Sequence, residues 1–199
     1  MIKTKKDLEE YLICDTQQLG ITRKFPRPFT DEIWKYEIAL RRYEYWYNQK
    51  SVLSRVIRII YKFHWHRWGV KLSIGIAPNV CDKGLSIAHL GAVNINQNAR
   101  IGKNCRIHEG VTVGASGGSD APIIGDNVFL ASGCKVMGKV TIESGCVVGA
   151  NAVVIKDVLE KNITVAGIPA HKISNNNSDK FIYWYQYNND ADWKFKNEN

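Results

Sequence analysis

The chain has 199 residues, a formal net charge of +8 and an odd number of cysteines, five. This length is sufficient for one domain with a substantial core. No apolar run approaches the roughly 20 residues that a membrane-spanning helix needs, and the charged start, with Lys3, Lys5 and Lys6, differs from a signal peptide. These features disfavour membrane-spanning and secreted disulfide-rich proteins, and they predict a cytoplasmic protein with reduced thiols.

The first seventy residues predict two helices. Thr30 or Asp31 can cap a helix that runs to about Glu44, and Ser51 can cap a second one that is ended by Gly69. This part therefore forms a short helical segment ahead of the rest of the chain.

The second predicted helix is strongly basic. No Asp or Glu occurs from Tyr45 to Cys81, whereas six Lys and Arg residues do. Two interpretations stay open: a solvated basic face with an aromatic stripe packed on the following domain, or a surface that meets an anionic partner such as a membrane or a lipid-linked glycan. Nucleic acid is disfavoured because no binding motif accompanies the charge. His64 and His66 on this helix are interpreted as surface or packing residues.

The second half of the chain repeats an aliphatic residue at every sixth position, and a second small or β-branched residue follows four positions later. This period fits neither an isolated helix nor a hairpin strand, but it fits short strands and turns stacked as coils. We therefore predict a mainly β fold, a parallel β-helix. The aliphatic positions are Ile95, Ile101, Ile107 and Val113, and then, after a loop of five extra residues, Ile124, Leu130, Val136, Ile142, Val148 and Val154.

Four segments of this region resemble the hexapeptide-repeat acyltransferases, and in particular the serine acetyltransferase branch and its polysaccharide-associated relatives. The resemblance implies a left-handed parallel β-helix, a homotrimer with active sites between subunits, acetyl-CoA as co-substrate and no metal. The segments are Gly84 to Gly114, Ala121 to Gly138, Val147 to Val158 and Val165 to Ser174. The chain is divided accordingly into a helical segment (1–70), the β-helix (71–174) and a C-terminal tail (175–199).

His89 is the predicted catalytic residue. Acetyl transfer to a hydroxyl needs a general base that removes the hydroxyl proton. Counting hexads backwards from Ile95 places His89 where an aliphatic residue is expected, and a polar residue there carries a cost that a purely structural coil has no reason to accept. The segment Leu85 to Gly91 also aligns with the segment that carries the catalytic histidine of serine acetyltransferases.

His108 follows His89 by 19 residues, close to one turn of three hexads, so the two are expected on the same side of the β-helix. His108 is interpreted either as a structural residue or as part of the acceptor side of the site, together with Glu109 and Asp82. Asp82, Glu109 or a backbone carbonyl can orient the ring of His89. A zinc site is disfavoured, because no third histidine closely follows His108.

Similarity to the galactoside acetyltransferase pattern implies where coenzyme A is bound. Small side chains allow the pantetheine arm to approach the backbone, and a lysine can meet phosphate as a point charge. The implied contacts are Ser132, Ala150, Ile155 and Lys156, with His171 at a position that is usually basic and Lys172 as a further cation.

The predicted acceptor is a sugar hydroxyl of a surface or capsular polysaccharide. Two Asp residues of serine acetyltransferases align with Ala88 and Gly75, and their Arg-His pair aligns with Asp120 and Ala121. Without these groups the two charges of L-serine lack partners. The alternatives are a serine O-acetyltransferase and a non-catalytic trimeric scaffold that binds a glycan.

Overall fold

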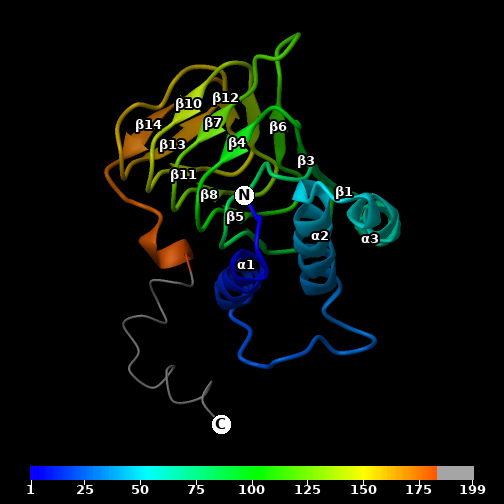
Figure 1. Ribbon diagram of the computed structural model, residues 1–199. Coiled ribbons are helices and arrows are strands. Elements are labelled where there is room, and N and C mark those ends of the chain that lie inside the picture. The colour runs from blue at the N-terminus through cyan, green and yellow to red at the C-terminus, as the bar shows by residue number, and fades with distance from the viewer. Residues whose placement is uncertain (183–199) are drawn as a thin grey trace.

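The computed structural model describes residues 1–182, which form three helices followed by a parallel β-solenoid (Figure 1). The predicted mainly β fold of stacked hexapeptides is thereby confirmed, while most of the predicted C-terminal tail lies outside the described residues. The helices are α1 (Lys5–Gln18), α2 (Glu32–Asn48) and α3 (Val52–Leu72), and a short 3-10 helix, η1, spans Asp179–Phe181. The strands are β1 (Ile74–Ile76), β2 (Ser86–Ile87), β3 (Val93–Ile95), β4 (Arg100–Ile101), β5 (Arg106–Ile107), β6 (Thr112–Gly114), β7 (Ile123–Ile124), β8 (Phe129–Leu130), β9 (Lys135–Met137), β10 (Thr141–Ile142), β11 (Val147–Val148), β12 (Val153–Val154), β13 (Thr164–Gly167) and β14 (Ala170–Ser174).

The strands form three sheets, one for each face of the solenoid. Their orders are β1-β3-β6-β9-β12, β4-β7-β10 and β2-β5-β8-β11-β13, and β14 adds to the last sheet as an antiparallel edge strand. Asn94 pairs with Thr112 and Lys135 pairs with Val153, so a regular coil advances by three hexads. Thr112 pairs with Lys135 because this coil also contains the extra loop at 115–122.

The aliphatic ladder fills the solenoid. Its ten residues are all 6% exposed or less. Full burial of such side chains stabilises a fold by about 1.5–3 kcal/mol each, and the stacking of coils makes that burial possible. The second position of the hexad is also buried, and it holds Cys105, Cys134 and Cys146 as free thiols. Burial raises the pKa of Cys134 to about 12, so this thiol is a packing residue.

The helical segment contains one helix more than the sequence predicted. Helix α1 begins with a capping box, in which the Thr4 hydroxyl accepts the Asp7 amide at 3.0 Å and the Asp7 carboxylate accepts the Thr4 amide at 2.8 Å. Its buried side chains are Tyr11, Asp15 and Gln18. A search for apolar residues at helical spacing misses this helix, because its buried face is polar.

Helix α3 continues beyond its predicted end. Ser51 caps its start as predicted, but Gly69 lies within the helix, which ends at Leu72 before Ser73 adopts a φ of 59°. A Cβ atom on Gly69 would approach the carbonyl oxygen of Ile74 to 2.8 Å. This glycine therefore permits close packing of the helix on β1 and does not terminate it.

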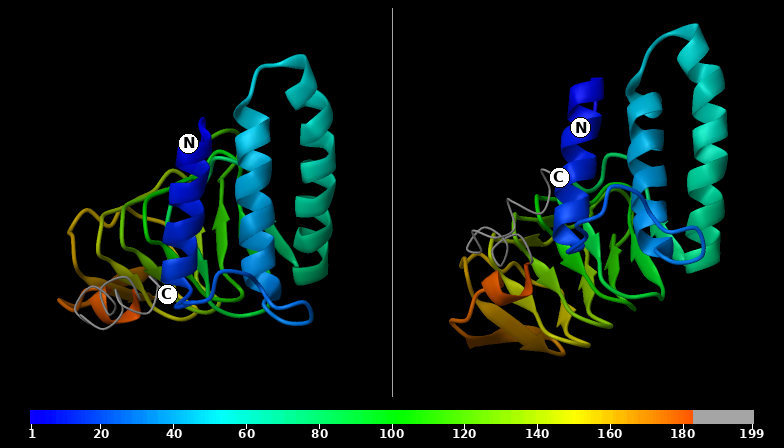
Figure 2. Two further views of the ribbon diagram at one scale, coloured as in Figure 1. Left: turned by 60° about the horizontal axis from the view of Figure 1, so that its bottom comes forward. Right: turned by 90° about the horizontal axis from the view of Figure 1, so that it is seen from below.

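Helix α2 lies between α1 and α3, and α3 is the outermost element of the helical layer (Figure 2). Two aromatic residues of α3 face α2: Trp65 stacks on Tyr43 at 5.0 Å and Tyr61 stacks on Trp46 at 6.1 Å between ring centroids. The sequence-based expectation of a stripe packed on the β-helix omits α2, although Trp65 and Trp68 also pack against the core that α2 and the β-helix share. Within residues 1–182, no helix is both long and apolar enough to cross a bilayer.

Candidate active site

One corner of the solenoid brings together polar residues from successive coils. Strands β2, β5, β8 and β11 pair in parallel and end at this corner, so the residues that follow them are stacked. The backbone hydrogen bonds continue this register past the strands, from the Ala88 amide to the Ile107 carbonyl and onwards along the stack. Two residues after each strand, the equivalent place is taken in turn by His89, Glu109, Ser132 and Ala150.

His89 and His108 lie together, as their spacing predicts. Their rings meet edge to face, with centroids 4.7 Å apart and an interplanar angle of 83°. Ring nitrogens of both histidines and a carboxylate oxygen of Glu109 all lie within 4.8 Å of one another. His89 is exposed, whereas His108 and Glu109 are partly buried. We call His89, His108 and Glu109 the histidine cluster.

The position of His89 differs from the backward count of hexads. Ile87 pairs with Ile107 and is the inward side chain of the first coil, so His89 lies two residues beyond the buried ladder, on the exposed corner. The register slips because twenty residues, not eighteen, separate these partners. The argument that His89 intrudes into the aliphatic ladder is therefore wrong, and its contact with His108 supplies a better reason to single it out.

Ser132 connects the two partly buried members of the cluster. Its hydroxyl oxygen lies 3.3 Å from Nδ1 of His108, and a hydrogen bond from the hydroxyl to Glu109 is the main cause of the lowered pKa of that carboxylate. Burial, reinforced by the charges of His89 and Arg106, lowers the pKa of His108 and keeps this ring neutral at pH 7.

The cluster also supplies three donors of the kinds that zinc accepts, two imidazoles and a carboxylate. The third donor is the carboxylate of Glu109, which directly follows His108, and not a third histidine.

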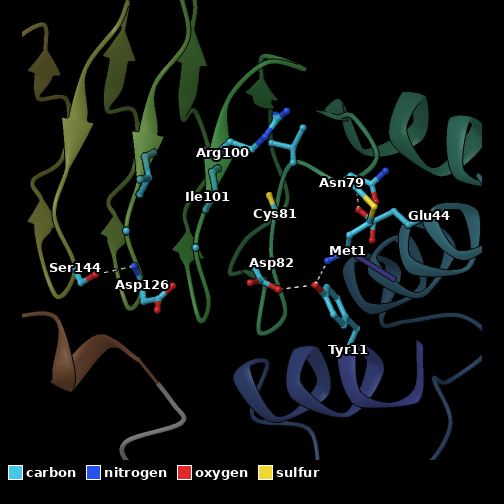
Figure 3. A pocket seen from close by; sticks show the side chains of 14 residues that line it. Met1, Tyr11, Glu44, Asn79, Cys81, Asp82, Arg100, Ile101, Asp126 and Ser144 are labelled. Atoms are coloured by element: carbon cyan, nitrogen blue, oxygen red, sulfur yellow. Dashed lines mark hydrogen bonds between the residues drawn. The ribbon is translucent and has the colours of Figure 1, made fainter. Parts of the chain in front are cut away.

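Asp82, predicted on the acceptor side, lies apart from the histidine cluster of the same chain. It precedes β2 whereas His89 follows β2, so the two residues lie at opposite ends of the strand. The Asp82 carboxylate accepts a hydrogen bond from the Tyr11 hydroxyl at 2.5 Å in a pocket of about 420 Å³ beside α1 (Figure 3). Arg100 and Asp126 line the same pocket, and none of its described lining residues belongs to the histidine cluster.

The predicted coenzyme A residues lie in three different places. Ser132 and Ala150 lie on the corner of the histidine cluster. Ile155, 52% exposed, and Lys156 follow β12 at the next corner, which belongs to another face. His171 and Lys172 lie on β14, where the Lys172 ammonium contacts the Glu160 carboxylate at 2.5 Å.

Carboxylates of the helices bind the strand that carries His89. Strand β2 is the edge of its sheet, so the amides that point away from β5 have no neighbouring coil to accept them. Glu37 of α2 accepts the Ile87 amide at 2.9 Å. Asp15 of α1 accepts the amides of Gly84 and Leu85 at 2.8 and 2.9 Å. The first coil is therefore held by side chains in place of a preceding coil.

A buried arginine balances these carboxylates. Arg41 is 0% exposed and donates to Asp15 at 2.7 Å, to Glu44 at 2.9 Å and to the carbonyl of Cys81 at 2.8 Å. Glu37 receives no such bond from it. Burial, with the charge of Asp15 added, raises the pKa of Glu37 well above its usual range, and its Oε2 has no hydrogen-bond partner among the described residues.

Comparison with known proteins defines the class of this molecule. Residues 121–156 match the bacterial transferase hexapeptide (six repeats) family. This match and the hexapeptide solenoid support the hexapeptide-repeat acyltransferase family for this chain.

Within this class, the chain is similar to serine acetyltransferases. It is 37% identical over 142 residues to the enzyme from Staphylococcus xylosus, an alignment that covers 70% of this chain and 61% of the relative. It therefore spans about three fifths of the length of this relative. The solved serine acetyltransferase of Neisseria gonorrhoeae is 26% identical with a TM-score of 0.58, covering 85% of this chain and 64% of that one. That of Brucella abortus, 24% identical with a TM-score of 0.66 over 87% of this chain and 72% of that one, shares the fold.

These relatives overturn the predicted acceptor. The sequence argument took the departures at Gly75, Ala88, Asp120 and Ala121 as evidence for a sugar hydroxyl of a polysaccharide. Sequence similarity over most of the chain is instead to serine acetyltransferases.

Proposed function

We propose that this protein is a serine O-acetyltransferase that transfers an acetyl group from acetyl-CoA to the hydroxyl of L-serine. The observation that supports this best is the histidine cluster, which lies on a solenoid corner in a chain 37% identical to serine acetyltransferases. The solved Brucella abortus serine acetyltransferase described in complex with coenzyme A has the same fold, which supports acetyl-CoA as the donor.

His89 acts as the general base. It would remove the proton from the serine hydroxyl as the hydroxyl oxygen attacks the thioester carbon, and return that proton to the sulfur as the C–S bond breaks. Glu109 would orient the ring of His89 and stabilise its protonated form, a role supported by a carboxylate oxygen within 4.8 Å of a ring nitrogen. The neutral His108 keeps one ring nitrogen as an acceptor on the same corner.

The corner fits an extended thioester arm. Along the stacked positions the side chains become smaller with distance from His89, from Glu109 to Ser132 and then to the exposed Ala150. This leaves a strip where a linear chain can approach the backbone and direct its reactive end to His89. Lys156 at the next corner would meet the phosphates as a point charge.

L-Serine carries two charges that the site must answer. Arg106 brings a positive charge close enough to His108 to contribute to its lowered pKa, and Glu109 supplies a negative one. We assign Arg106 to the serine carboxylate. These two residues take the place of the aligned groups that this chain lacks.

The exposure of the corner supports a homotrimer with active sites between subunits. His89 is exposed, and its neighbour Leu90 is 61% exposed. A catalytic base that faces water on one side needs a cover that excludes the water. A second subunit of a symmetric assembly can supply that cover. The cytoplasm remains the expected location, since the five cysteines are free thiols and four of them are buried in the fold.

The test is a direct assay. The purified protein is incubated with acetyl-CoA and L-serine, the release of free thiol is followed, and O-acetylserine is identified by mass spectrometry. Glycine, which lacks the hydroxyl, and the His89→Ala variant are the controls. Thiol release that requires both L-serine and His89 supports the proposal. Release at the rate of uncatalysed hydrolysis would overturn it.

A further inference from the structure

The outward face of α3 is a continuous apolar ridge. Val52, Val56, Ile59, Phe63 and Val70 are 77, 58, 67, 63 and 68% exposed. Their spacing of three, four and seven residues places them on one stripe of the helix. We call these five residues the α3 ridge. The buried residues of α3 lie on the opposite side, against α2 and β1.

Basic side chains border the ridge on both sides. At about 3.6 residues per turn, Arg55 and Lys62 project to one side of it, and Arg67 and Lys71 to the other. All four are exposed, and among residues 1–182 none of them forms an ion pair with an acid. Helix α3 itself contains no Asp or Glu.

The position of α3 leaves this face open. It is the outermost element of the helical layer (Figure 2). The exposure of the ridge residues and the burial of Ser54, Gly69 and Leu72 on the other side of the helix place the ridge away from α2. An apolar stripe between two basic borders is the pattern of a helix that lies in the interface of a membrane, with its apolar residues among the acyl chains and its cations near the headgroups. A second copy of the chain is a poorer fit, because pairing two ridges would bring like charges together on both borders.

We propose that α3 docks this protein on an anionic phospholipid surface. The α3 ridge inserts into the boundary between headgroups and acyl chains, and the bordering cations bind the anionic headgroups. This inference concerns the place where the protein works, and it does not depend on the identity of the acceptor or on the histidine cluster.

The experiment is co-sedimentation of the full chain with vesicles. Vesicles of phosphatidylcholine alone are compared with vesicles that also contain phosphatidylglycerol, and only the second kind is expected to bind. Ile59→Ser with Phe63→Ser should weaken binding on the order of 100-fold, because two inserted apolar side chains are lost. Arg55→Gln with Lys62→Gln should weaken it on the order of 30-fold, since each cation near such a surface contributes about 1 kcal/mol.

Matched controls separate the effect of the α3 ridge from non-specific hydrophobic binding and from the effect of net charge. Phe29→Ser removes an aromatic ring that is 93% exposed in the loop before α2, and it should bind as the wild type does. Lys139→Gln with Lys161→Gln removes the same charge from exposed sites on the solenoid. It should weaken vesicle binding several-fold less than the pair of substitutions on α3.

Size measured by sedimentation velocity without lipid completes the test. Supporting results are unchanged size and folding in the ridge variant together with lost vesicle binding. Three results would overturn the proposal: no binding of the wild type to anionic vesicles, equal binding of the ridge variant, or a ridge variant that changes the number of subunits, which would assign the ridge to a contact between copies.

Discussion

The carboxylate of Glu37 accepts the amide of Ile87 at 2.9 Å, two residues before His89. Helix α2 thereby fixes the position of strand β2, which precedes the proposed base. The contact replaces a ladder hydrogen bond that an earlier coil would otherwise make, so Glu37 is a positioning residue for the site.

Replacement of Glu37 should separate its acceptor role from its charge. Glu37→Gln keeps a carbonyl oxygen for the Ile87 amide and should retain most activity. Glu37→Ala leaves that amide buried without a partner, at a cost of about 1–3 kcal/mol, and lets the strand shift. We expect kcat to fall in the alanine variant while the KM for acetyl-CoA stays close to that of the wild type. Steady-state kinetics on both variants checks this, and equal kcat values in the two would remove the positioning role.

The raised pKa of Glu37 makes stability depend on pH. The folded state holds a proton on this carboxyl that the unfolded chain releases above about pH 4.3. Stability from this group is therefore fully present below the unfolded pKa and is lost as pH rises towards the folded one, by up to about 1.4 kcal/mol per pH unit. Urea unfolding at a series of pH values should show a steeper decline in the wild type than in Glu37→Gln, in which the raised pKa values of Asp15 and Glu44 still contribute. A parallel decline in both proteins would show that another group is responsible.

His89→Ala should fold and assemble normally but lose about 10² to 10⁴ in kcat, the usual contribution of a positioned general base. His64→Ala, at an exposed site on α3, is the matched control and should leave kcat unchanged. The assignment fails if His89→Ala turns over near the wild-type rate.

Removal of metal should leave the reaction intact. The histidine cluster has donors that zinc accepts, but the proposed proton transfer uses His89 as a free base and needs no ion. Activity measured after dialysis against a chelator is expected to equal that of the untreated protein. A loss that added zinc restores would show that the cluster works as a metal site.

Ser132→Ala should move the acid limb of the activity profile. The hydroxyl of Ser132 lowers the pKa of Glu109, so its removal raises that pKa. If an ionised Glu109 orients His89, activity is lost as pH falls through this pKa, and the loss should begin at a higher pH in the variant. The dependence of kcat/KM on pH is the measurement, with Ser119→Ala in the exposed loop as control. An unshifted acid limb would exclude Glu109 from the catalytic unit.

The sequence predicted the solenoid because its core is built from one repeated rule, an aliphatic residue at every sixth position, which needs no knowledge of distant contacts. The same rule brings His89 and His108 together, although the coil that carries them has 20 residues where the rule gives 18. Helix α1 obeys no such rule, since Asp15 is buried only because Arg41 and two backbone amides of the first coil surround it. The separation of Lys156 from Ser132 follows from the repeat, since 24 residues are four hexads and a regular coil has three.

The sealing of β2 by Glu37 and Asp15 has a consequence for the behaviour of the protein at high concentration. An open sheet edge is a template on which another chain can add a strand, and a stack of parallel coils offers such an edge at each end. At the first coil the carboxylates already occupy the outward amides of Gly84, Leu85 and Ile87. The helices thus protect the fold from growing end to end into fibres, and a chain shortened from its N-terminus would be expected to aggregate.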